Sequence, residues 1–191
     1  MLKTTQARFT LLVSAFFILL LIITVVVIQL FVTPQLKQSE STIVGNSVDQ
    51  IATAITAQMN KVEAQARSIT QAVAIMDSNT IDQLFPGLVD QYGDSNVFGG
   101  GIWPLPNKRE QGVIKFSTFF ARNGENKLTV NTHWNSPESQ NYFEQPWYKD
   151  CLNAPKGFCA WAKAYQDDAS PQPRTNGAMA IYKGDEAYGV S

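Results

Sequence analysis

Hydrophobic and polar positions divide the chain into three stretches with different patterns. Residues 9–32 are almost continuously apolar, and the few polar residues among them are uncharged. A helix rises about 1.5 Å per residue, so this stretch is long enough to cross a hydrocarbon core of about 30 Å. Signal peptides have shorter apolar runs that end at a small-x-small cleavage site. We therefore predict an uncleaved transmembrane signal anchor, and a secreted, processed chain is the alternative.

The charges beside this stretch predict its orientation. Lys3 and Arg8 precede the apolar run, and the next cation is Lys37. Because positive charge is retained on the cytoplasmic side of a membrane, residues 1–8 are expected in the cytoplasm and the chain after residue 32 outside.

Residues 33–77 change to a helical period. Apolar residues recur at steps of three or four, with polar residues between them. We call these positions the apolar stripe: Val44, Val48, Ile51, Ile55, Met59, Val62, Ala66, Ile69, Val73 and Met76. So long a helix predicts a stalk that leaves the membrane, packs first against a twin helix in a homodimer, and then packs against its own domain. The alternative is a helix that lies wholly on its own domain.

Residues 78–191 form the third stretch. A short helix is expected over residues 80–92, with Asp77 or Ser78 as its cap and Pro86 as a potential break. After residue 93, glycines and prolines separate short apolar runs that we expect to be strands. Turn signals lie at Asn123-Gly124 and at Lys183-Gly184. The runs cover residues 97–103, 113–122, 127–134, 158–166, 178–183 and 187–191.

Helices followed by an antiparallel sheet predict an α+β domain. The last run ends without a cap or turn, so we expect the sequence to be a fragment of a longer protein and the third stretch to be truncated at its C-terminal end.

Composition excludes several function classes. The formal net charge is −1, which gives no basic surface for a nucleic acid. His133 is the only histidine, so the chain offers no Ser/His/Asp or Cys/His arrangement. The triple glycine at residues 99–101 lacks the trailing G-K-[ST] of a phosphate-binding loop, and we interpret it as a flexible turn before a strand. No enzyme activity, metal or cofactor is expected.

Cys151 and Cys159 are the only cysteines. In an oxidising exterior the simplest interpretation is a disulfide that closes a small loop, while two free thiols are the alternative. Metal ligation is disfavoured because there is no second cysteine pair.

Several motifs together resemble a known family. GGGIWPLP, FSTFFARNGENKLTV, YFEQPWYKD and the segment from WAKAYQ to the end are similar to the membrane-distal half of a double Cache domain. In that family a transmembrane helix and a long stalk helix precede two stacked PAS-like modules, and the distal module usually holds the ligand. The resemblance implies the periplasmic sensor of a bacterial inner-membrane receptor, most like a methyl-accepting chemotaxis protein. A diguanylate cyclase, a histidine kinase or a non-sensing interaction domain is the alternative.

The resemblance also implies a ligand site. The amino-acid-binding branch of the family has a Tyr, an Arg two residues before a Trp-Tyr pair, and an Asp shortly after. Trp147, Tyr148 and Asp150 match, but Gln145 stands at the Arg position and Gln140 at the Tyr position. Glutamine cannot form the bidentate, charged fork by which arginine holds a carboxylate. We therefore expect an amine or polyamine in preference to an amino acid.

An acidic, aromatic pocket would suit such a ligand, because aromatic faces attract ammonium groups. Trp103 and Trp134 are instead expected to be core residues. Asp168 is an additional candidate acid beside the predicted site residues, which are Tyr142, Glu144, Trp147, Tyr148, Asp150, Tyr165 and Asp167.

Overall fold

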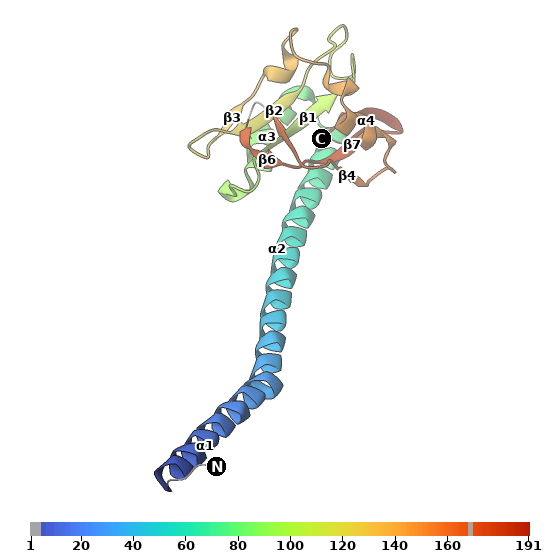
Figure 1. Cartoon of the computed structure of the whole chain (residues 1–191). Helices are drawn as coiled ribbons and strands as arrows, with labels where there is room; N and C mark the ends of the chain where they lie inside the picture. Colours follow the sequence, from blue (N-terminus) through green and yellow to red (C-terminus); the bar gives the residue numbers. More distant parts are fainter. Residues whose placement is uncertain (1–4, 168–169) are drawn as a thin grey trace. The chain divides into compact units, whose positions relative to one another are not determined.

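The computed structural model of the chain describes residues 5–167 and 170–191 (Figure 1). It separates into two compact units, Met1–Thr56 and Ala57–Ser191, which are described in turn.

The first unit is helical. Helix α1 spans Thr5–Val27, and none of its described residues is buried. It is long and apolar enough to cross a membrane by length and composition. The hydroxyls of Thr10 and Thr24 donate to the carbonyls of Gln6 (3.0 Å) and Leu20 (2.9 Å), so these polar side chains are satisfied within the helix.

A π-helical turn, Ile28–Val32, joins α1 to helix α2, which spans Thr33–Ile75. The backbone N–H and the hydroxyl of Thr33 both donate to the carbonyl of Ile28. The prediction of one long helix after the apolar run is therefore confirmed, with a local widening at their junction.

The apolar stripe of α2 has two environments. Val44, Val48, Ile51 and Ile55 are between 55% and 61% exposed. Further along, Ala66, Ile69 and Val73 are buried in the core of the second unit. The inner part of the stripe, from residue 66 to residue 73, thus packs on its own domain, as both alternatives required. The outer part of the stripe, from residue 44 to residue 55, is not covered by any described residue.

A six-stranded antiparallel sheet dominates the second unit, in the order β3-β2-β1-β8-β7-β4 (Figure 1). Its strands are β1 (Gly99–Pro104), β2 (Thr118–Arg122), β3 (Leu128–Val130), β4 (Cys159–Trp161), β7 (Gly177–Lys183) and β8 (Glu186–Val190). Strands β5 (Tyr165–Asp167) and β6 (Ser170–Arg174) form a separate ribbon. The predicted PAS-like α+β fold is confirmed, with the chain's last strand paired beside its first.

One core cluster lies between the sheet and two helices. Helix α3 (Ser78–Asp90) contributes Ile81, Phe85 and Val89, and these pack with the inner end of α2 and with sheet residues such as Ile102. Asp77 caps α3 as predicted, because its carboxylate accepts from the backbone N–H groups of Asn79 and Thr80, both at 3.0 Å. That capping also lowers the pKa of Asp77, mainly through the Thr80 hydroxyl.

Two sequence interpretations are wrong. Pro86 lies inside α3 and does not end it. The triple glycine is not a flexible turn but the beginning of β1, as the expected strand run over residues 97–103 implied. A Cβ atom at Gly101 would lie 2.3 Å from the carbonyl oxygen of Thr118 on β2, so glycine is required because the two backbones approach closely there.

A second core cluster contains helix α4, which spans Pro146–Asn153 and has no periodic pattern in the sequence that predicts it. Tyr148 and Cys151 of α4 pack against Ala178, Ala180 and Val190 of the sheet. Small side chains on the strand leave room for the large tyrosine ring. This cluster supports the candidate site.

Candidate functional site

Two buried tyrosines fix helix α4 to the sheet: Tyr142 in the turn before α4 and Tyr148 within it. Tyr142 and Tyr148 are both 0% exposed. The Tyr148 hydroxyl donates to the carbonyl of Trp103 at 2.9 Å, and the Tyr142 hydroxyl donates to the carbonyl of Pro104 at 2.7 Å. Burial raises the pKa of both phenols. In this structure they attach α4 and the turn before it to β1, and neither side chain is accessible.

Trp147 projects into a group of aromatic rings that we call the tryptophan cluster: Trp103, Trp134 and Trp147. The Trp147 ring lies 5.4 Å from that of Trp103 and 6.4 Å from that of Trp134, both edge to face. All three are half-buried and pack against the second core cluster. Trp103 and Trp134 are expected to be core residues from the sequence; in the structure the rings of both also pack on Trp147, the predicted site residue.

Trp134 is positioned by its neighbour in the 3-10 turn His133–Asn135. The Asn135 amide accepts from the Ser117 backbone N–H (2.7 Å) and donates to the Ser117 carbonyl (2.8 Å). The Lys115 ammonium donates to the carbonyls of Ser136 (2.5 Å) and Ser139 (2.9 Å). Charged donors to several carbonyls make strong, fixed contacts, so the turn that carries Trp134 is fastened to the segment before β2.

The two glutamines that depart from the family pattern lie together. Gln145 Nε2 donates to Gln140 Oε1 at 2.9 Å. Gln145 also stands directly before α4 as its N-cap residue, without a side-chain cap bond. A neutral amide pair therefore occupies the place where the resemblance implied a phenol and a guanidinium.

The predicted acids lie on different elements of the fold. Glu144 and Asp150 are exposed and lie three residues before and after Trp147, and Asp150 shares its helix. Tyr165 is 39% exposed on β5, in the separate ribbon. Asp167 ends β5, but its side chain lies outside what the structure describes, and so does Asp168.

The predicted disulfide is not formed in this structure: Cys151 and Cys159 are both free thiols. Burial raises the pKa of the Cys151 thiol to about 12 and that of the Cys159 thiol to about 11. Since the thiolate is the form that attacks a disulfide or an oxidant, this burial disfavours oxidation of the pair.

This arrangement predicts slow thiol labelling. At pH 8, below both raised pKa values, Ellman's reagent is expected to react with neither cysteine of the folded protein over minutes. After unfolding in guanidinium without reductant, both thiols should react. Absence of thiol after unfolding would show that the disulfide forms after all.

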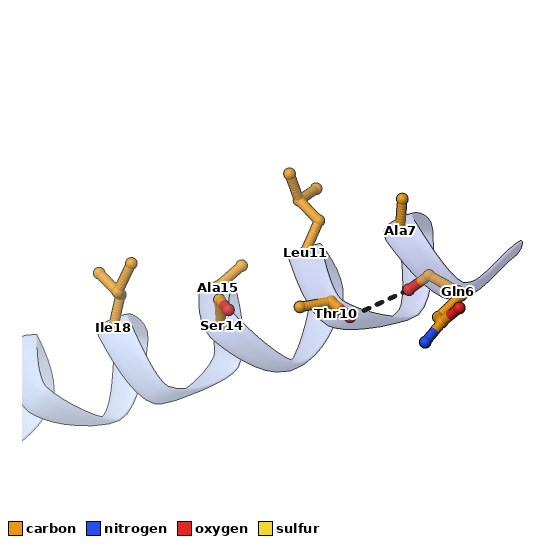
Figure 2. A pocket seen from close by; sticks show the side chains of 7 residues that line it. All are labelled: Gln6, Ala7, Thr10, Leu11, Ser14, Ala15 and Ile18. Atoms are coloured by element: carbon orange, nitrogen blue, oxygen red, sulfur yellow. Dashed lines mark hydrogen bonds between the residues drawn. The ribbon is translucent and has the colours of Figure 1, made fainter. Parts of the chain in front are cut away.

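A further hollow lies outside this region, on the first helix. Figure 2 shows it along one side of α1, beside Gln6, Thr10, Ser14 and Ile18. Its walls come from a single helix, so it is a groove between side chains in the proposed membrane span. It encloses no site for a soluble ligand.

Comparisons with known proteins agree with the fold. Residues 88–191, more than half of the chain, match the profile of the methyl-accepting chemotaxis protein-like first PDC sensor domain. No curated protein matches. Among solved structures, "Methyl-accepting Chemotaxis protein X" is similar with a TM-score of 0.57 and 16% identity, over 80% of this chain and 62% of that one. The ligand-binding domain of Campylobacter jejuni chemoreceptor Tlp3, in complex with L-valine, has a TM-score of 0.52 and 14% identity, over 80% and 58%. The chain thus spans about three fifths of the length of these structures.

Proposed function

Because the chain belongs to the methyl-accepting chemotaxis protein-like PDC sensor domains, we propose that it senses a small amine or polyamine at the tryptophan cluster. The observation that supports this most is that the rings of Trp103 and Trp134 both pack on Trp147. Gln145, two residues before Trp147, is paired with Gln140 and carries no charge. Aromatic faces attract an ammonium group by about 0.5–2 kcal/mol each. Exposed Glu144 and Asp150, close in sequence to Trp147, add negative charge.

An α-amino acid is the competing ligand. Tlp3 was solved with L-valine, and its domain has the same fold. A free α-carboxylate needs a charged partner, however, and Gln145 supplies only a neutral amide that already donates to Gln140. We therefore favour the amine, which carries the charge that the aromatic faces attract.

A ligand series separates these alternatives. The full chain in detergent micelles would be heated with n-butylamine, putrescine, L-valine or butyrate, each at the same concentration. A ligand at 100 times its Kd adds about 2.7 kcal/mol of stability, which raises the melting temperature by several degrees. We expect a rise with the two amines and none with butyrate. A rise with L-valine alone would favour the amino-acid alternative, and no rise with any compound would contradict small-molecule sensing of these classes.

We also propose that α2 carries the signal from a periplasmic domain to the membrane. The C-terminal end of α2 is buried in the domain core. The polar face of α2 is attached to the domain through the Asp94 carboxylate, which accepts from Lys61 at 2.6 Å and from Gln58 at 3.3 Å. The Lys61 bond is the main reason that the pKa of Asp94 is well below its usual range. A ligand can shift the equilibrium between two arrangements of the domain, and so of this helix, only to the extent that it binds the two arrangements with different affinity.

The outer part of the apolar stripe supports a homodimer. Val44, Val48, Ile51 and Ile55 follow steps of four, three and four, which is the a/d spacing of a two-stranded coiled coil. The next step, to Met59, is again four, so the heptad register breaks at the place where the stripe enters its own domain. We propose that the outer stripe packs on the same stripe of a second copy.

Cysteine cross-linking tests the dimer. Ile51→Cys in the full chain in membranes should form a disulfide-linked dimer within minutes of mild oxidation, because the two stripes would face each other. Asp49→Cys, two residues away on the polar face, is the matched control and should cross-link at least severalfold more slowly. Equal cross-linking at both positions would contradict the proposed seam.

A further inference from the structure

The indole nitrogen of Trp103 is buried, and among the described residues it has no hydrogen-bond partner. Buried N–H groups in folded proteins are nearly all paired, so each exception requires an explanation. Trp103 lies on β1, and its own carbonyl is already used by the Tyr148 hydroxyl.

The aromatic rings nearest to Trp103 provide no oxygen or nitrogen acceptor for its N–H. The rings nearest to Trp103 are Phe119 at 5.3 Å and Trp147 at 5.4 Å. Tyr148 and Tyr142, which adjoin the cluster, direct their hydroxyls to the carbonyls of Trp103 and Pro104. The Trp103 N–H is thus a buried donor on a ring of the tryptophan cluster, and no described residue accepts its hydrogen bond.

We propose that Trp103 is a specificity-determining residue whose indole N–H donates to an acceptor on the ligand. The inference rests on the proposed function and narrows its ligand class to amines that also carry a neutral acceptor, such as a carbonyl or a hydroxyl. A carboxylate is a poorer partner, because one neutral donor does not compensate the burial of a full negative charge. The aromatic faces of Trp134 and Trp147 would hold the ammonium end.

Two probes of the same shape test the assignment: 4-aminobutanamide, which has a carbonyl, and 4-methylpentylamine, which has methyl groups in its place. With the full chain in micelles, calorimetric titration should show the amide binding at least tenfold more tightly. In Trp103→Phe, which keeps an aromatic ring but removes the N–H, the ratio of the two affinities should fall to near one. Trp161→Phe, outside the cluster, is the matched control and should keep the ratio.

Stability of the unliganded protein separates recognition from packing. Trp103→Phe removes a buried donor without a partner but also leaves a small cavity beside Phe119 and Trp147, so its melting temperature should fall by no more than a few degrees. A larger fall in melting temperature with equal loss of affinity for both probes would overturn the assignment in favour of a packing role. Equal binding of the two probes by the wild type would overturn it too, while the proposed amine sensing would stand. If neither probe nor any amine binds, both proposals fail.

Discussion

Tyr148→Ala is expected to destabilise the sensor domain by about 3–5 kcal/mol, the range found when a large buried aromatic side chain is removed. Tyr148 is fully buried, packs in the second core cluster and fixes α4 to β1 through the Trp103 carbonyl. Its removal would leave a cavity and remove the side-chain donor to the Trp103 carbonyl, which keeps its pairing with β8. Guanidinium unfolding of the full chain in micelles, followed by tryptophan fluorescence, measures the loss.

Two variants control this prediction. Tyr92→Ala removes the same side chain from a fully exposed position and should change the free energy of unfolding by no more than about 0.5 kcal/mol. Tyr148→Phe removes only the hydroxyl and should cost about 1–2 kcal/mol, because the Trp103 carbonyl loses its side-chain donor. If Tyr148→Ala costs no more than Tyr92→Ala, the buried anchor assigned to Tyr148 is wrong.

The second large effect concerns binding. Trp147→Ala should weaken the binding of n-butylamine by about tenfold, since an ammonium group gains about 1–2 kcal/mol from a good aromatic face that is shielded from water. Trp147 contacts both other members of the tryptophan cluster, so its loss also disturbs their positions. Calorimetric titration of the full chain gives the change in Kd.

Phe158→Ala serves as the matched control for Trp147→Ala. Phe158 is an aromatic residue outside the cluster and is 65% exposed. Its removal should leave the amine Kd unchanged within a factor of two. Similar losses in both variants would mean that the amine does not bind at the tryptophan cluster.

Much of the fold could be predicted from periodicity. The continuous apolar run predicted α1 by its length. The 3.6-residue stripe predicted α2, because burial of one helix face imposes a regular spacing on the sequence. Asp77 marked the start of α3, since capping chemistry is local. The Gly184 turn between β7 and β8 adopts a positive φ of 65°, which favours glycine and was visible as a turn signal.

Other elements could not be predicted, for physical reasons. Helix α4 has eight residues, too few for a helical period to emerge, and its stability comes from tertiary packing of Tyr148 and Cys151. Strand β6 contains two prolines, which are confined to edge strands and usually argue against a strand. The strand through the triple glycine was expected from the run over residues 97–103, but the need for glycine there depends on the close approach of β1 and β2, which are distant in sequence.

The candidate site was predicted only in part. Trp147 was identified from its motif, but a motif does not show which distant residues meet it. Trp103 and Trp134 come from β1 and a 3-10 turn, and only the folded sheet brings their rings to Trp147. Tyr142 and Tyr148 were predicted to contact the ligand, but in the structure both side chains are buried and their hydroxyls bind carbonyls of β1.

The most direct test of the central proposal is to observe the indole N–H signals during titration with n-butylamine. The chain contains four tryptophans, so a nitrogen-15 labelled sample of the full chain in micelles gives four such signals. Amine binding at the tryptophan cluster predicts saturable shifts for Trp103, Trp134 and Trp147, with Trp161 unchanged. Absence of any saturable shift, or a shift confined to Trp161, would contradict it.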